Sequence, residues 1–177
     1  RSIAWINSTF SGSYRETLDN PALNIDISQT RKGRIKYGYV FNIEQAISED
    51  VGVFGRWSWT NGTAEIMAFT DIDASLSGGV SIKGAKWGRE NDKIGIGYAV
   101  NALSKDHRDF LAAGVMGILI GDGRLNYRME QVLESYYSLA LNKDASLAFD
   151  YQLLTNPAYN ADRGPISIYA ARLHWER

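Results

Sequence analysis

The sequence predicts an all-β protein of antiparallel strands, each with one apolar and one polar face. The main observation lies in the last third of the chain, where apolar and polar residues alternate with the period of two that a β-strand requires. A second is composition, because 17 Gly, 10 Tyr and 5 Trp beside only 3 Pro are typical of strands joined by many turns. The apolar positions of the three alternating runs are Leu133, Tyr137, Leu139 and Leu141, then Leu147, Phe149, Tyr151 and Leu153, then Tyr169, Ala171, Leu173 and Trp175.

Alternation alone does not show which face of the strands points to the inside of the protein. A soluble barrel buries its apolar face, whereas a transmembrane β-barrel turns that face to lipid and its polar face to a lumen. Three features favour the membrane barrel. The strands run about 10–12 residues, enough to cross a bilayer at a tilt, against about 5–6 for ordinary strands. Tyr151, Tyr169 and Trp175 lie near run ends, where an interfacial aromatic girdle would be. The polar face also carries charges of both signs.

The first half of the chain contains both weak and strong strand signals. Residues 2–21 are hard to interpret, although Ile3, Trp5 and Phe10 fit a strand. Residues 23–28 alternate and predict a short strand, followed by a polar turn at 29–34. The clearest strand spans 34–47, and a second spans 51–59 after a turn at 48–50. Their apolar faces carry Ile35, Tyr37, Tyr39, Phe41 and Ile43, and then Val51, Val53, Trp57 and Trp59.

The second half adds further hairpins and one long connection. Residues 63–75 alternate only weakly and are either a strand or an inserted loop. Strands are expected at 76–83 and 94–101, separated by a turn at 85–92. Residues 103–129 form the longest connection, and its first part is expected to form a helical turn. We find no linker or internal repeat, so residues 1–177 are expected to form one β-barrel domain or part of a larger barrel.

The connections between the expected strands are short at one end of the sheet and long at the other. If the carboxyl end lies on the periplasmic side, turns 48–50, 85–92 and 142–144 share that side. The connections at 60–75, 103–129 and 155–165 then lie outside, provided that 63–75 is a loop. Outer-membrane barrels have this asymmetry of short periplasmic turns and longer external loops.

Composition excludes several other classes. Lys plus Arg (19) nearly balance Asp plus Glu (20), so no bulk charge favours a nucleic-acid partner. There is no cysteine, and the two histidines lack metal-ligand spacing, so we expect no metal and no cofactor. The longest nearly apolar run, 110–121, is too short for a membrane-spanning helix. No signal peptide follows Arg1, so an exported protein would be present in mature or fragment form.

Several segments together resemble the carbohydrate-selective porin (OprB-like) family of Gram-negative outer membranes. The most specific are GYVFNIEQAISEDVGVFGRWSW (38–59), the turn with Gly88, Arg89 and Asp92, and DYQLLTNPAYNADRGP (150–165). The similarity covers roughly residues 20–174. It implies an outer-membrane barrel of about sixteen strands, of which about 8 would lie here, so the chain would be the C-terminal half. Such a half has two unpaired edges that lipid cannot satisfy. The family usually ends in an aromatic residue, and Arg177 departs from this.

The resemblance implies a polar lumen through which small carbohydrates diffuse passively. Arg56 and Arg172 are the first candidates for sugar contacts, because a guanidinium fork suits vicinal hydroxyls. Tyr136 is the candidate for stacking on a sugar ring. Asp71, with Glu65 and Asp73, is expected on a loop that folds into the pore, the alternative being an ordinary solvated loop. The remaining candidates, which an inward salt-bridge ladder would also explain, are Lys36, Glu44, Glu134, Asp150 and Gln152.

Three functions compete at this stage. The first is a sugar-selective channel with outer-membrane lipid and small carbohydrates as partners, together with the missing barrel half or other porin protomers. The second is a soluble β-barrel ligand-binding module whose apolar face is its core. The third is a carbohydrate-active enzyme with a carboxylate pair, either Glu65 with Asp71 or Glu134 with Asp150. We favour the channel, and expect no catalytic residue.

Overall fold

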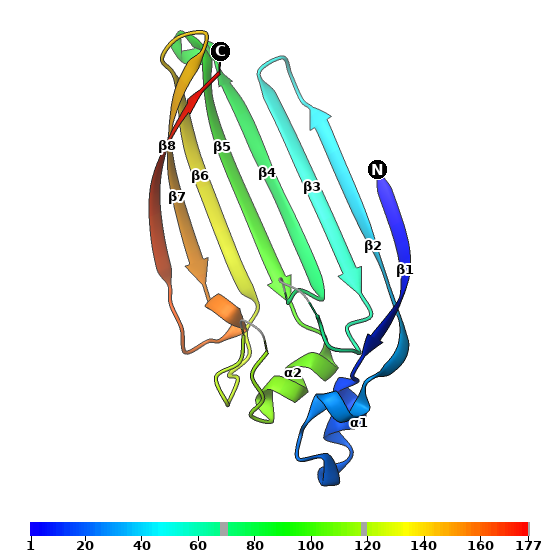
Figure 1. The fold of residues 1–177 in the computed structure, drawn as a ribbon. Helices are drawn as coiled ribbons and strands as arrows, with labels where there is room; N and C mark the ends of the chain where they lie inside the picture. The colour runs from blue at the N-terminus through cyan, green and yellow to red at the C-terminus, as the bar shows by residue number, and fades with distance from the viewer. Residues whose placement is uncertain (68–70, 118–119, 177) are drawn as a thin grey trace.

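A computed structural model of the chain describes residues 1–67, 71–117 and 120–176. These residues form one antiparallel sheet of eight strands, in which each strand pairs with the next along the chain (Figure 1). The all-β antiparallel prediction is therefore confirmed. The strands are β1 (Ser2–Ser11), β2 (Lys32–Ala46), β3 (Val51–Thr60), β4 (Ala74–Gly84), β5 (Arg89–Ala102), β6 (Glu130–Ala140), β7 (Ala145–Thr155) and β8 (Ile166–Trp175).

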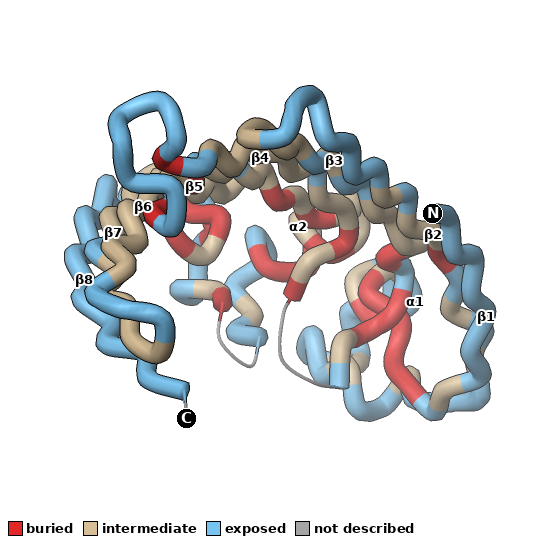
Figure 2. The backbone as a smooth tube through the Cα atoms, turned by 90° about the horizontal axis from the view of Figure 1, so that it is seen from above, coloured by how far each residue is buried: buried red, intermediate tan, exposed pale blue. Residues whose placement is uncertain are grey.

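The sheet curves into an open arch, and most of its large apolar residues lie on the outer, convex face (Figure 2). Ile43 is 70% exposed there and Leu173 is 69% exposed, although both are large and apolar. Aromatic side chains of β2 and β3 pack against one another on this face, with the rings of Tyr39 and Trp57 5.0 Å apart. A soluble barrel would bury these residues, whereas a membrane barrel presents them to lipid.

Connection lengths differ between the two ends of the sheet. Residues 47–50, 85–88 and 141–144 make short turns at one end. At the other end lie the connections 12–31, 61–73, 103–129 and 156–165 (Figure 1). The predicted asymmetry is therefore present. The described parts of 63–75 that precede Ala74 form no strand, so this segment is an inserted loop rather than a strand; residues 68–70 lie outside the described residues.

Other boundaries correct the sequence prediction. The short strand expected at 23–28 is wrong, because two 3-10 helices, η1 (Pro21–Leu23) and η2 (Ile27–Thr30), occupy this segment. Asn20 and Asp26 cap them by accepting hydrogen bonds from backbone N–H groups. The weak signals near the amino end belong to the full strand β1, and β5 begins at Arg89, inside the expected turn. The departure at Arg177 lies outside the described residues.

The long connections gather at one end of the sheet, within the outline of the arch when it is viewed along the strands (Figures 1 and 2), and make the buried core. They carry α1 (Tyr14–Leu18), α2 (Lys105–Ala112) and η4 (Pro157–Tyr159). Figure 2 shows the buried positions gathered around these segments, beneath the curve of the sheet. One apolar cluster consists of Leu103, Leu111, Ile120, Leu125 and Tyr159. No described helix has the length and hydropathy needed to cross a bilayer.

A buried carboxylate links neighbouring strands at the end of the sheet where the turns are short. Asp92 is 2% exposed and accepts hydrogen bonds from the Arg89 guanidinium, from the Tyr137 hydroxyl and, at 2.9 Å, from the Ala140 N–H. The Trp87 indole donates to the Tyr137 hydroxyl at 3.2 Å. We call these residues the Asp92 network. It joins the β4–β5 hairpin to β6.

The arch does not close on itself. Over the described ranges, β1 pairs only with β2, and β8 pairs only with β7. Both strands are almost wholly exposed. Each therefore presents a row of unpaired backbone groups, which lipid cannot satisfy by hydrogen bonding.

Candidate functional site: the concave wall

The concave face of β2–β6 carries a hollow of about 730 Å³. Its floor carries only small side chains, because the inward-facing residues of β4 and β5 at this point are glycine, serine and alanine. A single row of paired residues crosses it, from Glu44 through Phe54, Gly79 and Gly97 to Glu134. We call it the glycine hollow. Its inward residues are Glu44, Ala46, Gly52, Phe54, Ser77, Ser81, Gly95, Gly97, Ala99, Val132, Glu134 and Tyr136.

A second hollow of about 450 Å³ adjoins the first on β6–β8. Glu134 and Tyr136 line both, so they stand on the boundary between the two. This polar hollow has charges of both signs, which lets it accept and donate hydrogen bonds to a neutral solute with many hydroxyls. Its other residues are Ser138, Ser146, Ala148, Asp150, Gln152, Ala170, Arg172 and His174.

The structure brings six of the nine predicted site residues into these two hollows. Glu44 lines the glycine hollow, and Asp150, Gln152 and Arg172 line the polar hollow, with Glu134 and Tyr136 shared. Lys36, Arg56 and Asp71 lie elsewhere.

Two predicted cations of the wall have partners within the protein. The Lys36 ammonium donates to the backbone carbonyls of Ala64 and Glu65, at 3.2 and 3.1 Å. Lys36 therefore holds the inserted loop against the wall. Arg56 lies opposite Asn42 in the sheet and donates to its side-chain oxygen at 3.2 Å.

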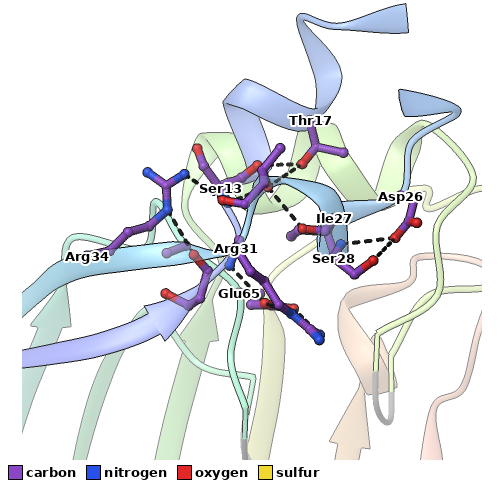
Figure 3. A network of polar contacts seen from close by, with 12 residues as sticks. Ser13, Thr17, Asp26, Ile27, Ser28, Arg31, Arg34 and Glu65 are labelled. Atoms are coloured by element: carbon purple, nitrogen blue, oxygen red, sulfur yellow. Dashed lines mark hydrogen bonds and ion pairs between the residues drawn. The ribbon is translucent and has the colours of Figure 1, made fainter. Parts of the chain in front are cut away.

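The inserted loop is anchored by Glu65. Its carboxylate accepts from the Gly12 N–H at 2.8 Å and from the Arg31 guanidinium at 2.6 Å (Figure 3). Burial tends to raise the pKa of Glu65, but the hydrogen bonds from Arg31 and Gly12 outweigh it and lower that pKa. Neighbouring bonds order the first connection, with the Thr17 hydroxyl donating to the Ser13 carbonyl at 2.7 Å.

Asp71 and Asp73 are buried beneath the arch, at 8% and 4% exposure. Burial raises the pKa of the Asp71 carboxyl, with His107 opposing this and Asp73 adding to it. Asp73 accepts from the Ser104 N–H at 2.9 Å and lies 3.0 Å from Nδ1 of His107. Tyr14 stacks on the His107 ring at 4.4 Å. Asp71 therefore lies buried in the loop cluster at the end of the sheet, and its side chain is largely closed to solvent.

Sequence reasoning missed the floor of the glycine hollow and Phe54 above it. The signal was present, because Phe54 shares the polar parity with Gly52 and Arg56 in β3. Glycines on the same parity of β4 and β5 indicate the open floor once the strands are in register.

These features together define a class. Strands that are apolar outside and mostly polar inside, with short turns at one end and long connections at the other, are typical of the wall of a transmembrane β-barrel. The model of the carbohydrate-selective porin OprB family matches residues 1–176, and the chain belongs to this family.

A distant relative agrees with this. The chain is 23% identical over 143 residues to Porin AaxA of Chlamydia caviae, a match that covers 78% of this chain and 27% of that protein. The chain thus spans about a quarter of the length of the curated relative that it matches. No solved structure matches the chain significantly.

Proposed function

We propose that this chain forms part of the wall of an outer-membrane pore that lets small sugars diffuse passively through a polar lumen. The observation that carries the proposal is the contrast between the two faces of the sheet. The convex face exposes large apolar residues such as Ile43 and Leu173, whereas the concave face holds Glu134, Asp150 and Arg172. Family membership supports the same function.

The wall can bind a sugar weakly through its hydroxyl groups. Carboxylates of Glu134 and Asp150 accept hydrogen bonds, and the Arg172 guanidinium donates them. Each such bond replaces one to water and contributes only about 0.5–1.5 kcal/mol. Weak contacts suit a channel, because a solute must leave the wall as readily as it arrives.

Conductance measurements test this proposal. In planar bilayers containing the native, membrane-assembled protein, added glucose should lower the ion current as it occupies the lumen. Arg172→Gln should raise the half-blocking glucose concentration about threefold to tenfold, which corresponds to one lost hydrogen bond. Lys143→Gln, in an exposed turn where the side chain is 89% exposed, is the matched control. An ion current that glucose leaves unchanged would reject sugar passage.

The free edges suggest how the pore is completed. We propose that β1 and β8 pair with further strands of a longer polypeptide, in a barrel that this chain only partly forms. The support is that lipid leaves edge hydrogen bonds unsatisfied at several kcal/mol each. An intact mass from the native membrane, with heat-modifiable mobility on gels, tests this. A mass equal to that of this chain alone would count against it.

A further inference from the structure

Among the described residues, Trp5, Phe54 and Tyr136 lie on the polar face of the sheet, each above a glycine of the neighbouring strand. Trp5 of β1 covers Gly38 of β2 and does not line the glycine hollow, whereas the other two line it. Phe54 of β3 is paired with Gly79, and Tyr136 of β6 is paired with Gly95. A methyl group at Gly79 would lie 2.6 Å from Cε1 of Phe54, and one at Gly95 would overlap the ring of Tyr136. Both rings therefore lean along the wall and occupy the space that the glycines leave.

The two rings approach each other from opposite sides of the glycine hollow. Phe54 leans from β3 over β4, and Tyr136 leans from β6 over β5. Gly79 is paired with Gly97, two residues from Gly95 on the same face. With strands about 4.8 Å apart and two residues spanning about 6.8 Å, the supporting glycines are about 8 Å apart. The rings thus flank one short stretch of open wall.

A carboxylate accompanies each ring. Glu44 is paired with Phe54 across β2 and β3. Glu134 precedes Tyr136 by two residues, so both point to the same face of β6. All four side chains line the glycine hollow.

Covering a glycine can by itself stabilise a sheet. That role does not require Phe54 to meet the lumen, yet its side chain lies on the polar face and the residue is 44% exposed. An apolar ring facing water is unfavourable unless something covers it. A pyranose ring offers a suitable cover, because its C–H groups form an apolar face while its hydroxyls project from the rim toward acceptors.

We propose that Phe54 and Tyr136 form a stacking site for a pyranose ring, with Glu44 and Glu134 accepting hydrogen bonds from its hydroxyls. The proposal rests on sugar passage as the function and assigns where along the wall the sugar binds. It also predicts a preference for cyclic sugars. Glucose has the flat C–H face that stacking needs, whereas the acyclic polyol sorbitol has similar hydroxyls but no such face.

Current block by glucose and by sorbitol tests the site in the native, membrane-assembled protein. Phe54→Leu and Tyr136→Leu remove the flat ring but keep apolar cover over the glycines. Each should raise the half-blocking glucose concentration about threefold to tenfold, the range expected for one aromatic contact. The sorbitol response should stay unchanged. Tyr136→Phe keeps the ring and should retain the glucose block, and Trp57→Leu on the convex face is the control for loss of an aromatic residue.

The outcomes separate the site from the function. Leucine variants that alter glucose and sorbitol block equally would overturn stacking, since only pore shape would then have changed. Variants that lower thermal stability but leave glucose block intact would also overturn it and assign the rings a purely structural role. A wild-type pore that conducts ions but ignores glucose would remove the proposed function, and this site with it.

Discussion

The strand wall and the loop cluster of this protein are stabilised in different ways. In the wall, backbone hydrogen bonds join neighbouring strands while side chains on both faces remain largely accessible. Every buried apolar side chain of the described residues lies outside the strands, from Tyr14 to Tyr159. A membrane barrel needs no side-chain core in its wall, because lipid covers one face and the backbone pairs internally. The inward-facing residues of the wall are therefore not required for packing, whereas the loops pack like a small soluble domain.

The loop cluster should respond to a core cavity most strongly. Leu111 is fully buried, and Leu111→Ala should destabilise the cluster by about 2–5 kcal/mol. Limited proteolysis of the assembled protein should show faster cleavage in the long connections, while the β-sheet circular dichroism stays unchanged. Leu76→Ala, at an exposed position of β4, is the control. Equal cleavage in wild type and variant would contradict a packed cluster.

An arginine should destabilise the wall much more on its convex face than on its concave face. Phe149 lies on the convex face near the middle of β7 and is 53% exposed, whereas the neighbouring Ala148 lines the polar hollow. Phe149→Arg should cost about 2–4 kcal/mol, the penalty for a cation facing the middle of the bilayer. Ala148→Arg should cost little. Denaturant titration of folding into lipid vesicles measures both, and similar penalties would contradict the assignment of the faces.

The Asp92 network should contribute a smaller amount. Asp92→Ala leaves the Ala140 N–H and the Tyr137 hydroxyl without their acceptor. Each unsatisfied buried group costs about 1–3 kcal/mol. Thermal unfolding in detergent should therefore begin at a lower temperature. Asp144→Ala, in the exposed turn between β6 and β7, should leave unfolding unchanged, and a similar shift in both variants would argue against a specific network.

The smallest effect should be the acid sensitivity of the inserted loop. Because the folded pKa of Glu65 is lowered, its stabilising effect is complete above the ordinary carboxyl pKa of about 4.3 and is lost as pH falls through the lowered value. Asp71, whose pKa is raised, acts with the opposite sign. Loop proteolysis should increase on acidification in wild type, and less in Glu65→Gln. An identical acid response in both would exclude Glu65 as the anchor.

The wall could be predicted from sequence, whereas the loop cluster could not. Alternation reports the two faces of a strand, so residues 34–47 and 130–175 were interpreted correctly. The same alternation misled at 23–28, where the helix-capping residues Asn20 and Asp26 were the better signal. The burial of Asp71 depends on distant partners, such as the Tyr159 hydroxyl that donates to its carbonyl at 2.6 Å. No local pattern reveals such a contact.

The Asp92 network also bears on how the strands find their alignment. Short turns set the register within the β4–β5 and β6–β7 hairpins, but a long connection joins β5 to β6 and leaves their alignment free. Asp92 of β5 meets Tyr137 and Ala140 of β6 in one register only. A slip of one residue would turn Glu134 toward lipid and Leu133 toward the lumen. The Asp92 carboxylate at the end of β5 thus helps to keep Glu134 and the other polar residues of β6 on the concave face.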